Sequence, residues 1–192
     1  YANKALKLDA NLARAYFLKG SIYRESGDTT NALSSLQTAV EQDNRYEDAF
    51  FDIGVMYAAR KNPLALEYYE NVIRINPANQ NVLYARAKLL QDLGRNDEAI
   101  REYTTILSKN KDCANCYYNL GAIYLNVKKN PETALAHFTK AIELDPNYSE
   151  AYFARGYTYS LLRDKKNARS DYGMCLKLQP NYEPAINALN AL

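Results

Sequence analysis

The chain contains no tryptophan, a single histidine and only three cysteines in 192 residues. This scarcity argues against a zinc site, and no motif places a serine or aspartate to act with His137 as a catalytic group. No apolar run approaches the roughly 20 residues that a membrane-spanning helix needs. The 24 basic and 22 acidic residues give a net charge of +2, which indicates neither a nucleic-acid nor a membrane partner. We therefore expect no metal, no cofactor and no enzyme activity.

What the chain does contain is one pattern that recurs every 33 to 35 residues. Two series of small residues carry it, and the second series follows the first by 11 to 13 residues. A fixed period near this length indicates one supersecondary unit stacked on copies of itself. The first series is Gly20, Gly54, Ala87, Gly121 and Gly156, and the second is Ala32, Ala65, Ala99, Ala134 and Ala168.

Residues 149–182 show the content of one unit. Apolar residues at helical spacing predict a first helix that Ser149 caps and a second helix from about Lys165 to Pro180. Two antiparallel helices of this length form a hairpin, and each hairpin leaves one face uncovered. We expect stacking of hairpins to supply the core, with the small residues allowing helices to approach closely.

The bends inside the units carry their own signals. Gly27 and Gly94 suit a left-handed helix end. The pairs Asn62-Pro63 and Asn130-Pro131 suit an N-cap followed by the first helical position. We therefore predict that the second helices of these two units begin at the Asn-Pro pairs.

The pattern resembles the tetratricopeptide repeat, which has an aromatic residue, then Leu-Gly and Tyr, then Ala, a second aromatic residue, Ala and Pro. The resemblance implies an all-α fold, a right-handed α-solenoid of stacked antiparallel helix hairpins in a single domain. Residues 80–113 depart most from the pattern, with Ala87 for Gly and Lys111 for Pro, and we expect looser packing there. In residues 114–148 the matching positions are Tyr117, Leu120, Gly121, Tyr124, Ala134, Phe138, Ala141 and Pro146.

The repeat divides the whole chain. We expect the missing first helix of the initial unit to lie in a longer protein, so that residues 1–12 are the tail of a preceding repeat. Five complete repeats and the start of another then follow. They are residues 13–46, 47–79, 80–113, 114–148 and 149–182, and residues 183–192.

The cysteines and the histidine can be compared with the residues at the same places in the other repeats. Cys116 and Cys175 stand where other repeats carry alanine, so we predict small core residues rather than a redox or metal centre. Cys113 lies in a turn, and the sequence leaves open whether it forms a disulfide with Cys116. We expect His137 to lie on the outer surface of a second helix.

The inner groove is the candidate site, because in this family the first helices line a concave channel. The fifth residue of each repeat, which we call the fifth place, is always aromatic here. We therefore expect a ladder of partly exposed rings suited to an extended peptide or partner helix. These rings are Phe17, Phe51, Tyr84, Tyr118 and Phe153. The predicted contact set is Asn81, Tyr84, Lys88, Asn115, Tyr118, Asn119 and Tyr157.

One family specialisation is not expected. The chaperone-tail binders of this family clamp a terminal carboxylate with Lys, Arg and Asn at fixed places, and of those only Asn119 is present. Phe51, Val55 and Ala85 occupy places that would need polar groups. We therefore expect a groove that does not depend on a terminal carboxylate.

The sequence favours a non-enzymatic scaffold that binds a protein or peptide in the concave groove. One alternative is self-assembly through exposed solenoid ends, where Ile186, Leu189 and Leu192 form an apolar face. A second alternative is an accessory domain of a larger protein whose activity lies outside this segment. Bacterial cytoplasm and periplasm both fit, so the compartment stays open.

Overall fold

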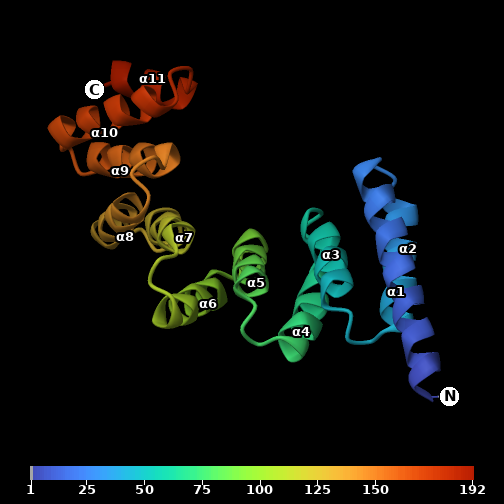
Figure 1. The fold of residues 1–192 in the computed structure, drawn as a ribbon. Helices are drawn as coiled ribbons and strands as arrows, with labels where there is room; N and C mark the ends of the chain where they lie inside the picture. Colours follow the sequence, from blue (N-terminus) through green and yellow to red (C-terminus); the bar gives the residue numbers. More distant parts are fainter. Residues whose placement is uncertain (1) are drawn as a thin grey trace. The chain divides into compact units, whose positions relative to one another are not determined.

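The structure is a computed structural model that describes residues 2–192, with side chains described from Leu12 onward. Within these residues the chain is all-α, with eleven helices and no strand (Figure 1). The predicted fold class is confirmed. The helices form two compact units, Tyr1–Gly94 and Arg95–Leu192. The boundary between the units falls inside residues 80–113, the repeat that departs most from the pattern, and a single continuous domain stays a prediction.

The first unit contains five helices. Helix α1 packs on α2 and α3 packs on α4, so that each pair forms one of the predicted hairpins. Further contacts of α2 with α3, of α4 with α5 and of α3 with α5 stack these elements into one body. The helices are α1 (Ala2–Glu25), α2 (Thr29–Gln42), α3 (Glu47–Ala58), α4 (Ala65–Ile75) and α5 (Gln80–Asp92).

The second unit contains six helices arranged in the same way. The hairpins are α7 with α8 and α9 with α10, and α6 and α11 cover the two ends of the stack. Contacts of α8 with α9 and of α7 with α9 join the two hairpins. The helices are α6 (Asn96–Lys109), α7 (Ala114–Asn126), α8 (Pro131–Leu144), α9 (Ser149–Leu161), α10 (Lys165–Leu178) and α11 (Glu183–Asn190).

Four glycines of the first series each place a first helix against its own partner. All five members are buried, and so are the alanines of the second series. A β-carbon added at Gly54 would lie 2.6 Å from Cε1 of Tyr69, and one added at Gly121 would lie 2.6 Å from Cε1 of Phe138. Leu36 meets Gly20 and Tyr172 meets Gly156 in the same way. The large side chain of the second helix therefore rests directly on the glycine of the first.

The predicted bends are only partly confirmed. Gly27 and Gly94 have φ values of +80° and +76°, as expected of left-handed helix ends. Asn130 caps α8, and Pro131 is its first residue. The prediction for Asn62-Pro63 is wrong, because Asn62 accepts a hydrogen bond from the Leu64 amide and α4 begins only at Ala65. This side-chain bond holds residues 62–64 in a turn and delays the helix.

Two further helix starts differ from the expectation. The N-cap of α9 is Tyr148 and Ser149 is the first helical residue, so Ser149 does not cap the helix. Helix α1 also runs without a break from Ala2 to Glu25, through the expected boundary at residue 12. Ala10, the strongest helix former, stands where other repeats have Pro77, Pro146 or Pro180, so nothing in that position interrupts the helix.

Two glycines of the second unit provide a matched test of the packing. We expect Gly121→Ala to lower the free energy of unfolding by about 1–3 kcal/mol, because the new methyl group overlaps Phe138. Nothing lies within 4 Å of a β-carbon added at Gly173 in α10. Gly173→Ala should therefore raise stability by about 1 kcal/mol through helix propensity. Urea denaturation followed by circular dichroism measures both, and equal effects of the two substitutions would contradict the packing role.

Candidate functional site

The fifth-place aromatic residues are partly exposed, as expected from the sequence. Most of these five rings also pack on other rings. In three cases the second ring belongs to the tyrosine that precedes the next hairpin, so the contact joins one hairpin to the next. These pairs are Phe17 with Tyr46, Tyr118 with Tyr148, and Phe153 with Tyr182, with ring centroids 5.2, 5.0 and 5.2 Å apart. Such pairs stabilise the stack beyond the burial of their surface.

The first unit contains three of the seven predicted contact residues. Tyr84 and Lys88 are half-buried on α5 and line a cavity of about 380 Å³, whereas Asn81 is exposed at the start of α5 and does not line it. Most of the lining is apolar. The Lys88 ammonium lies 2.5 Å from Oδ1 of Asp92, so the two charged lining residues neutralise each other. The cavity is lined by Val55, Ala58, Ala59, Tyr69, Tyr84, Ala85, Lys88, Leu89 and Asp92.

A second cavity of about 310 Å³ adjoins the first, because both are lined by Val55 and Ala59 of the α3 segment. We call the two together the α3 groove. The second cavity adds Arg24, Thr29, Met56 and Arg60 to the lining. The Arg24 guanidinium lies 2.6 Å from Oδ1 of Asp52. No ion pair is found for Arg60 among the described residues, so the groove has an apolar floor with one positive charge beside it.

The groove residues on α3 were missed as contacts in the sequence analysis. Val55 and Ala85 entered there only as residues that exclude a carboxylate clamp. Their small and apolar character was the available signal. The structure shows that these two positions line one cavity.

The second unit contains the other four predicted residues, on α7 and α9. Asn115 is exposed, and Tyr157 is 44% exposed. Tyr118 is half-buried between the rings of Tyr148 and Phe138, and its burial raises the pKa of its hydroxyl. Asn119 is only 6% exposed, so its amide offers little surface to a ligand. Asn115 and Tyr157 are therefore the accessible members of this set.

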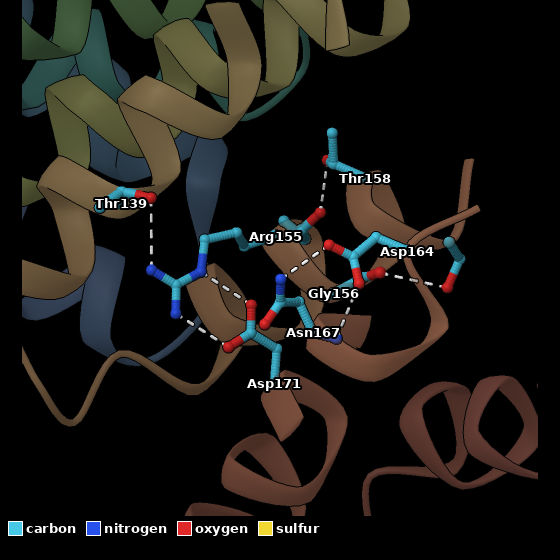
Figure 2. Close-up of polar contacts among 9 residues, drawn as sticks. Thr139, Arg155, Gly156, Thr158, Asp164, Asn167 and Asp171 are labelled. Carbon is cyan, nitrogen blue, oxygen red and sulfur yellow. Dashed lines mark hydrogen bonds and ion pairs between the residues drawn. The ribbon is translucent and has the colours of Figure 1, made fainter. Parts of the chain in front are cut away.

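Helix α9, which carries Tyr157, is held by a buried ion pair (Figure 2). The Arg155 Nε and Nη2 atoms donate to the two carboxylate oxygens of Asp171 on α10 at 2.7 and 2.8 Å. Its Nη1 atom donates to Oγ1 of Thr139 on α8 at 3.3 Å. The hydrogen bonds with Asp171 raise the pKa of the guanidinium. One side chain thus connects three helices, and this role was not predicted from the sequence. The available signal was an arginine at a place where the preceding repeat has Leu120.

The cysteines behave largely as the template predicted. Cys116 and Cys175 are both fully buried, and burial raises the pKa of the free Cys175 thiol. The open question about Cys113 is answered by a disulfide to Cys116, with Cα atoms 5.2 Å apart. Cys113 is also the N-cap of α7, and its Sγ accepts the Cys116 amide at 3.1 Å. The pair closes the first turn of the helix.

His137 lies on a second helix as expected, but it is less exposed than the sequence suggested. Its ring is half-buried and lies against Tyr124, with centroids 5.3 Å apart and planes 15° from parallel, while the Tyr117 ring lies at 6.1 Å. Burial lowers the pKa of the imidazole. Tyr117 and Tyr124 of α7 thus partly cover a histidine of α8. His137 is therefore a packing residue.

Two further properties bear on the site. Among the residues whose side chains are described, no three His, Cys, Asp or Glu residues lie together in a way that could hold a metal ion. No helix of the described chain is long and apolar enough to cross a membrane.

Comparison with known proteins places the chain among repeat proteins. Three family models described as tetratricopeptide repeat match residues 13–46, 84–149 and 137–171. Superkiller complex protein 3 of Mus musculus is 29% identical over 197 residues, which cover 97% of this chain and 12% of that protein. The Hsp70-Hsp90 organizing protein of Triticum aestivum is 25% identical over 183 residues, covering 93% of this chain and 30% of that protein. The chain thus spans less than a third of these relatives.

Solved structures show the same fold. YrrB, described as a protein of this repeat class with an unusual peptide-binding site, superposes with a TM-score of 0.72 at 20% identity. The match covers 99% of this chain and 97% of YrrB. A tetratricopeptide repeat protein from Parabacteroides merdae gives a TM-score of 0.81 at 18% identity, covering 94% and 72% of the two chains.

The Arg155–Asp171 pair gives a prediction for stability. Asp171→Ala leaves a largely buried guanidinium without its carboxylate, and we expect a loss of about 3 kcal/mol in the free energy of unfolding. The double variant Arg155→Leu with Asp171→Ala should lose less, because it removes both charges and places a leucine where Leu120 lies in the preceding repeat. Glu143→Ala, which removes the exposed Lys140–Glu143 pair, is the control and should change little. A double variant as unstable as Asp171→Ala would contradict this account.

Proposed function

The chain belongs to the tetratricopeptide repeat family, and we propose that it is a non-enzymatic scaffold that binds a peptide segment in the α3 groove. The family fold is that of a protein-interaction scaffold. The proposal goes further, since it names the first unit as the peptide site and an apolar side chain as the anchor of the partner. The observation that carries it is the cavity of about 380 Å³ between α3 and α5.

The residues around this cavity explain why an apolar anchor is favoured over a terminal carboxylate. Val55 and Ala85 line it directly, and the Phe51 ring lies 6.0 Å from that of Tyr69, which also lines it. These are the three places where a carboxylate clamp would need polar groups. An aliphatic side chain in the cavity would remove apolar surface from water at about 25 cal/mol per Å². Among the residues that line the cavity a carboxylate would meet one cation, Lys88, which Asp92 already neutralises.

Charge beside the groove suggests a second feature of the partner. Arg60 lies at the adjoining cavity and has no ion pair among the described residues. An acidic side chain next to the apolar anchor would meet this guanidinium and form a charge-assisted hydrogen bond. We therefore propose a partner segment that carries a large aliphatic residue with an acidic neighbour.

The names of related proteins are consistent with a scaffold role. One relative is an organizing protein for Hsp70 and Hsp90, and others are subunits of the superkiller and anaphase-promoting complexes. These names describe whole proteins of which this chain resembles a part. They support assembly with other proteins as the general role, while the α3 groove supplies the proposed chemistry.

A single substitution in the groove tests the proposal. Peptides are first selected on the wild-type chain from a library with random interior positions. We expect the selected peptides to share an aliphatic residue with an acidic neighbour. They should bind Val55→Glu at least about 30-fold more weakly, because the new carboxylate would have to be buried against the anchor. Fluorescence polarisation with labelled peptides measures this.

The control is Val127→Glu, which places the same charge at a 48% exposed valine of the second unit. Its affinity should equal that of the wild type, and amidation of the peptide terminus should change nothing. Equal binding to Val55→Glu, or loss of binding on amidation, would overturn the proposal.

Self-assembly is a second candidate, because α1 exposes Leu18 and Ile22, one helical turn apart, at 52% and 66%. A second copy could cover this face. Light scattering over a concentration series should then show a dimer that Ile22→Glu abolishes and Val55→Glu retains. A strict monomer at high concentration would exclude self-assembly for this chain.

A further inference from the structure

The first unit has another cavity that shares no lining residue with the α3 groove. Its volume is about 380 Å³. The loop between α2 and α3 contributes two residues, α3 contributes one and α4 contributes three. We name it the two-arginine pocket, lined by Asn44, Arg45, Phe50, Asn71, Arg74 and Ile75.

The pocket collects positive charge without an acidic residue in its lining. Arg45 and Arg74 come from different elements, and neither forms an ion pair within the described chain. Two guanidinium groups that share a cavity repel each other unless an anion lies between them. By contrast, the arginines at 24, 86, 95 and 155 are each paired with a carboxylate.

Two of the neighbouring acidic residues are already engaged elsewhere. Glu70 lies one helical turn before Arg74, where it would ordinarily form an i,i+4 pair. Instead it binds Arg86, with Nη1 and Oε2 2.8 Å apart. The Glu47 carboxylate accepts hydrogen bonds from the side-chain amides of Asn76 and Asn79, the shortest at 2.6 Å. No carboxylate is therefore available to neutralise the pocket from these positions.

The Arg74 guanidinium is also held in place. Asn71 Nδ2 donates to the backbone oxygen of Glu67 at 3.0 Å, and Asn71 Oδ1 accepts from Arg74 Nη1 at 3.3 Å. On the other side, Asp43 Oδ1 accepts the Arg45 amide at 2.9 Å and shapes the loop that carries Arg45. One side-chain hydrogen bond thus holds the Arg74 guanidinium, and another holds the backbone of Arg45.

The remaining wall of the pocket is apolar. Phe50 and Ile75 are half-buried, and the Phe50 ring lies 6.4 Å from that of Tyr68. A ligand with an apolar body gains binding free energy by burying that body against the ring and the aliphatic chain, whereas a free inorganic ion does not. The pocket therefore combines a place for an anion with a place for a ring.

We propose that the two-arginine pocket binds a phosphate monoester carried on an aromatic ring. A phosphate monoester has a charge of about −1.5 to −2 at neutral pH, which matches two guanidinium groups better than a carboxylate does. Its three oxygens accept forked hydrogen bonds from both arginines, and the Asn44 amide adds a further donor. The ring then lies against Phe50 and Ile75.

Titrations of the ¹⁵N-labelled full chain at low ionic strength test this site. Phenyl phosphate should give saturable shifts confined to residues 43–46, 50 and 71–75. It should bind at least about fivefold more tightly than benzoate or inorganic phosphate, since the first has one charge fewer and the second has no ring. Arg45→Gln and Arg74→Gln should each weaken the binding of phenyl phosphate by about tenfold or more.

Three controls make the result decisive. Arg169→Gln, at an exposed arginine of α10, should leave the affinity unchanged. Val55→Glu should also leave this affinity unchanged, so the experiment tests the two-arginine pocket independently of the α3 groove. Both glutamine variants should keep the wild-type melting temperature, because neither arginine forms an ion pair. Shifts spread over all exposed basic residues, or an equal loss in Arg169→Gln, would overturn the proposal.

The source of the phosphate is found by a parallel titration with a short glycine-flanked phosphotyrosine peptide. Tighter binding of the peptide than of phenyl phosphate identifies a phosphorylated protein as the ligand. Equal binding identifies a small aryl phosphate. Failure of both ligands to bind overturns the site.

Discussion

In four hairpins the large side chain of the second helix rests on a glycine of the first, and the rest of each unit depends on this contact. Tyr69 on Gly54 and Phe138 on Gly121 leave no room for even one methyl group. Helices that approach this closely can bury rings that would otherwise be too large for a layer one hairpin thick. Close approach also orders the neighbouring surfaces, because the residues between successive first helices line the α3 groove. A looser hairpin would lose both the core and the cavity.

Much of the fold could be predicted because periodicity reports which residues share a face. The glycine and alanine series and the buried Cys116 follow from that rule, and the helix ends at Gly27 and Gly94 follow from the left-handed conformation that glycine allows. The delayed start of α4 did not, because it depends on one hydrogen bond from the Leu64 amide to Asn62. The unbroken α1 was missed because the template was applied past Ala10, where the local helix propensity outweighs the repeat.

The candidate site was harder to predict, since a repeat template assigns a direction to each side chain but not its neighbours. Tyr118 and Asn119 do lie at groove places, yet one is covered by other rings and the other is buried. The cavity at Val55 and Ala85 is lined by small side chains from two different helices. The Arg155–Asp171 pair and the two-arginine pocket likewise depend on residues from separate helices. Such sites need three-dimensional distances, which a single sequence does not contain.

The tyrosine that precedes a hairpin has a consequence for engineered chimeras in which one repeat replaces another. Residues 13–46, 114–148 and 149–182 each end in a tyrosine that packs on the fifth-place ring of the same repeat. A chimera that exchanges these three repeats for one another would keep this pair of rings. Residues 47–79 end in Asn79 instead, and there the Glu47 carboxylate accepts hydrogen bonds from the side-chain amides of Asn76 and Asn79. A chimera would keep these hydrogen bonds only if the whole segment from Glu47 to Asn79 were moved together.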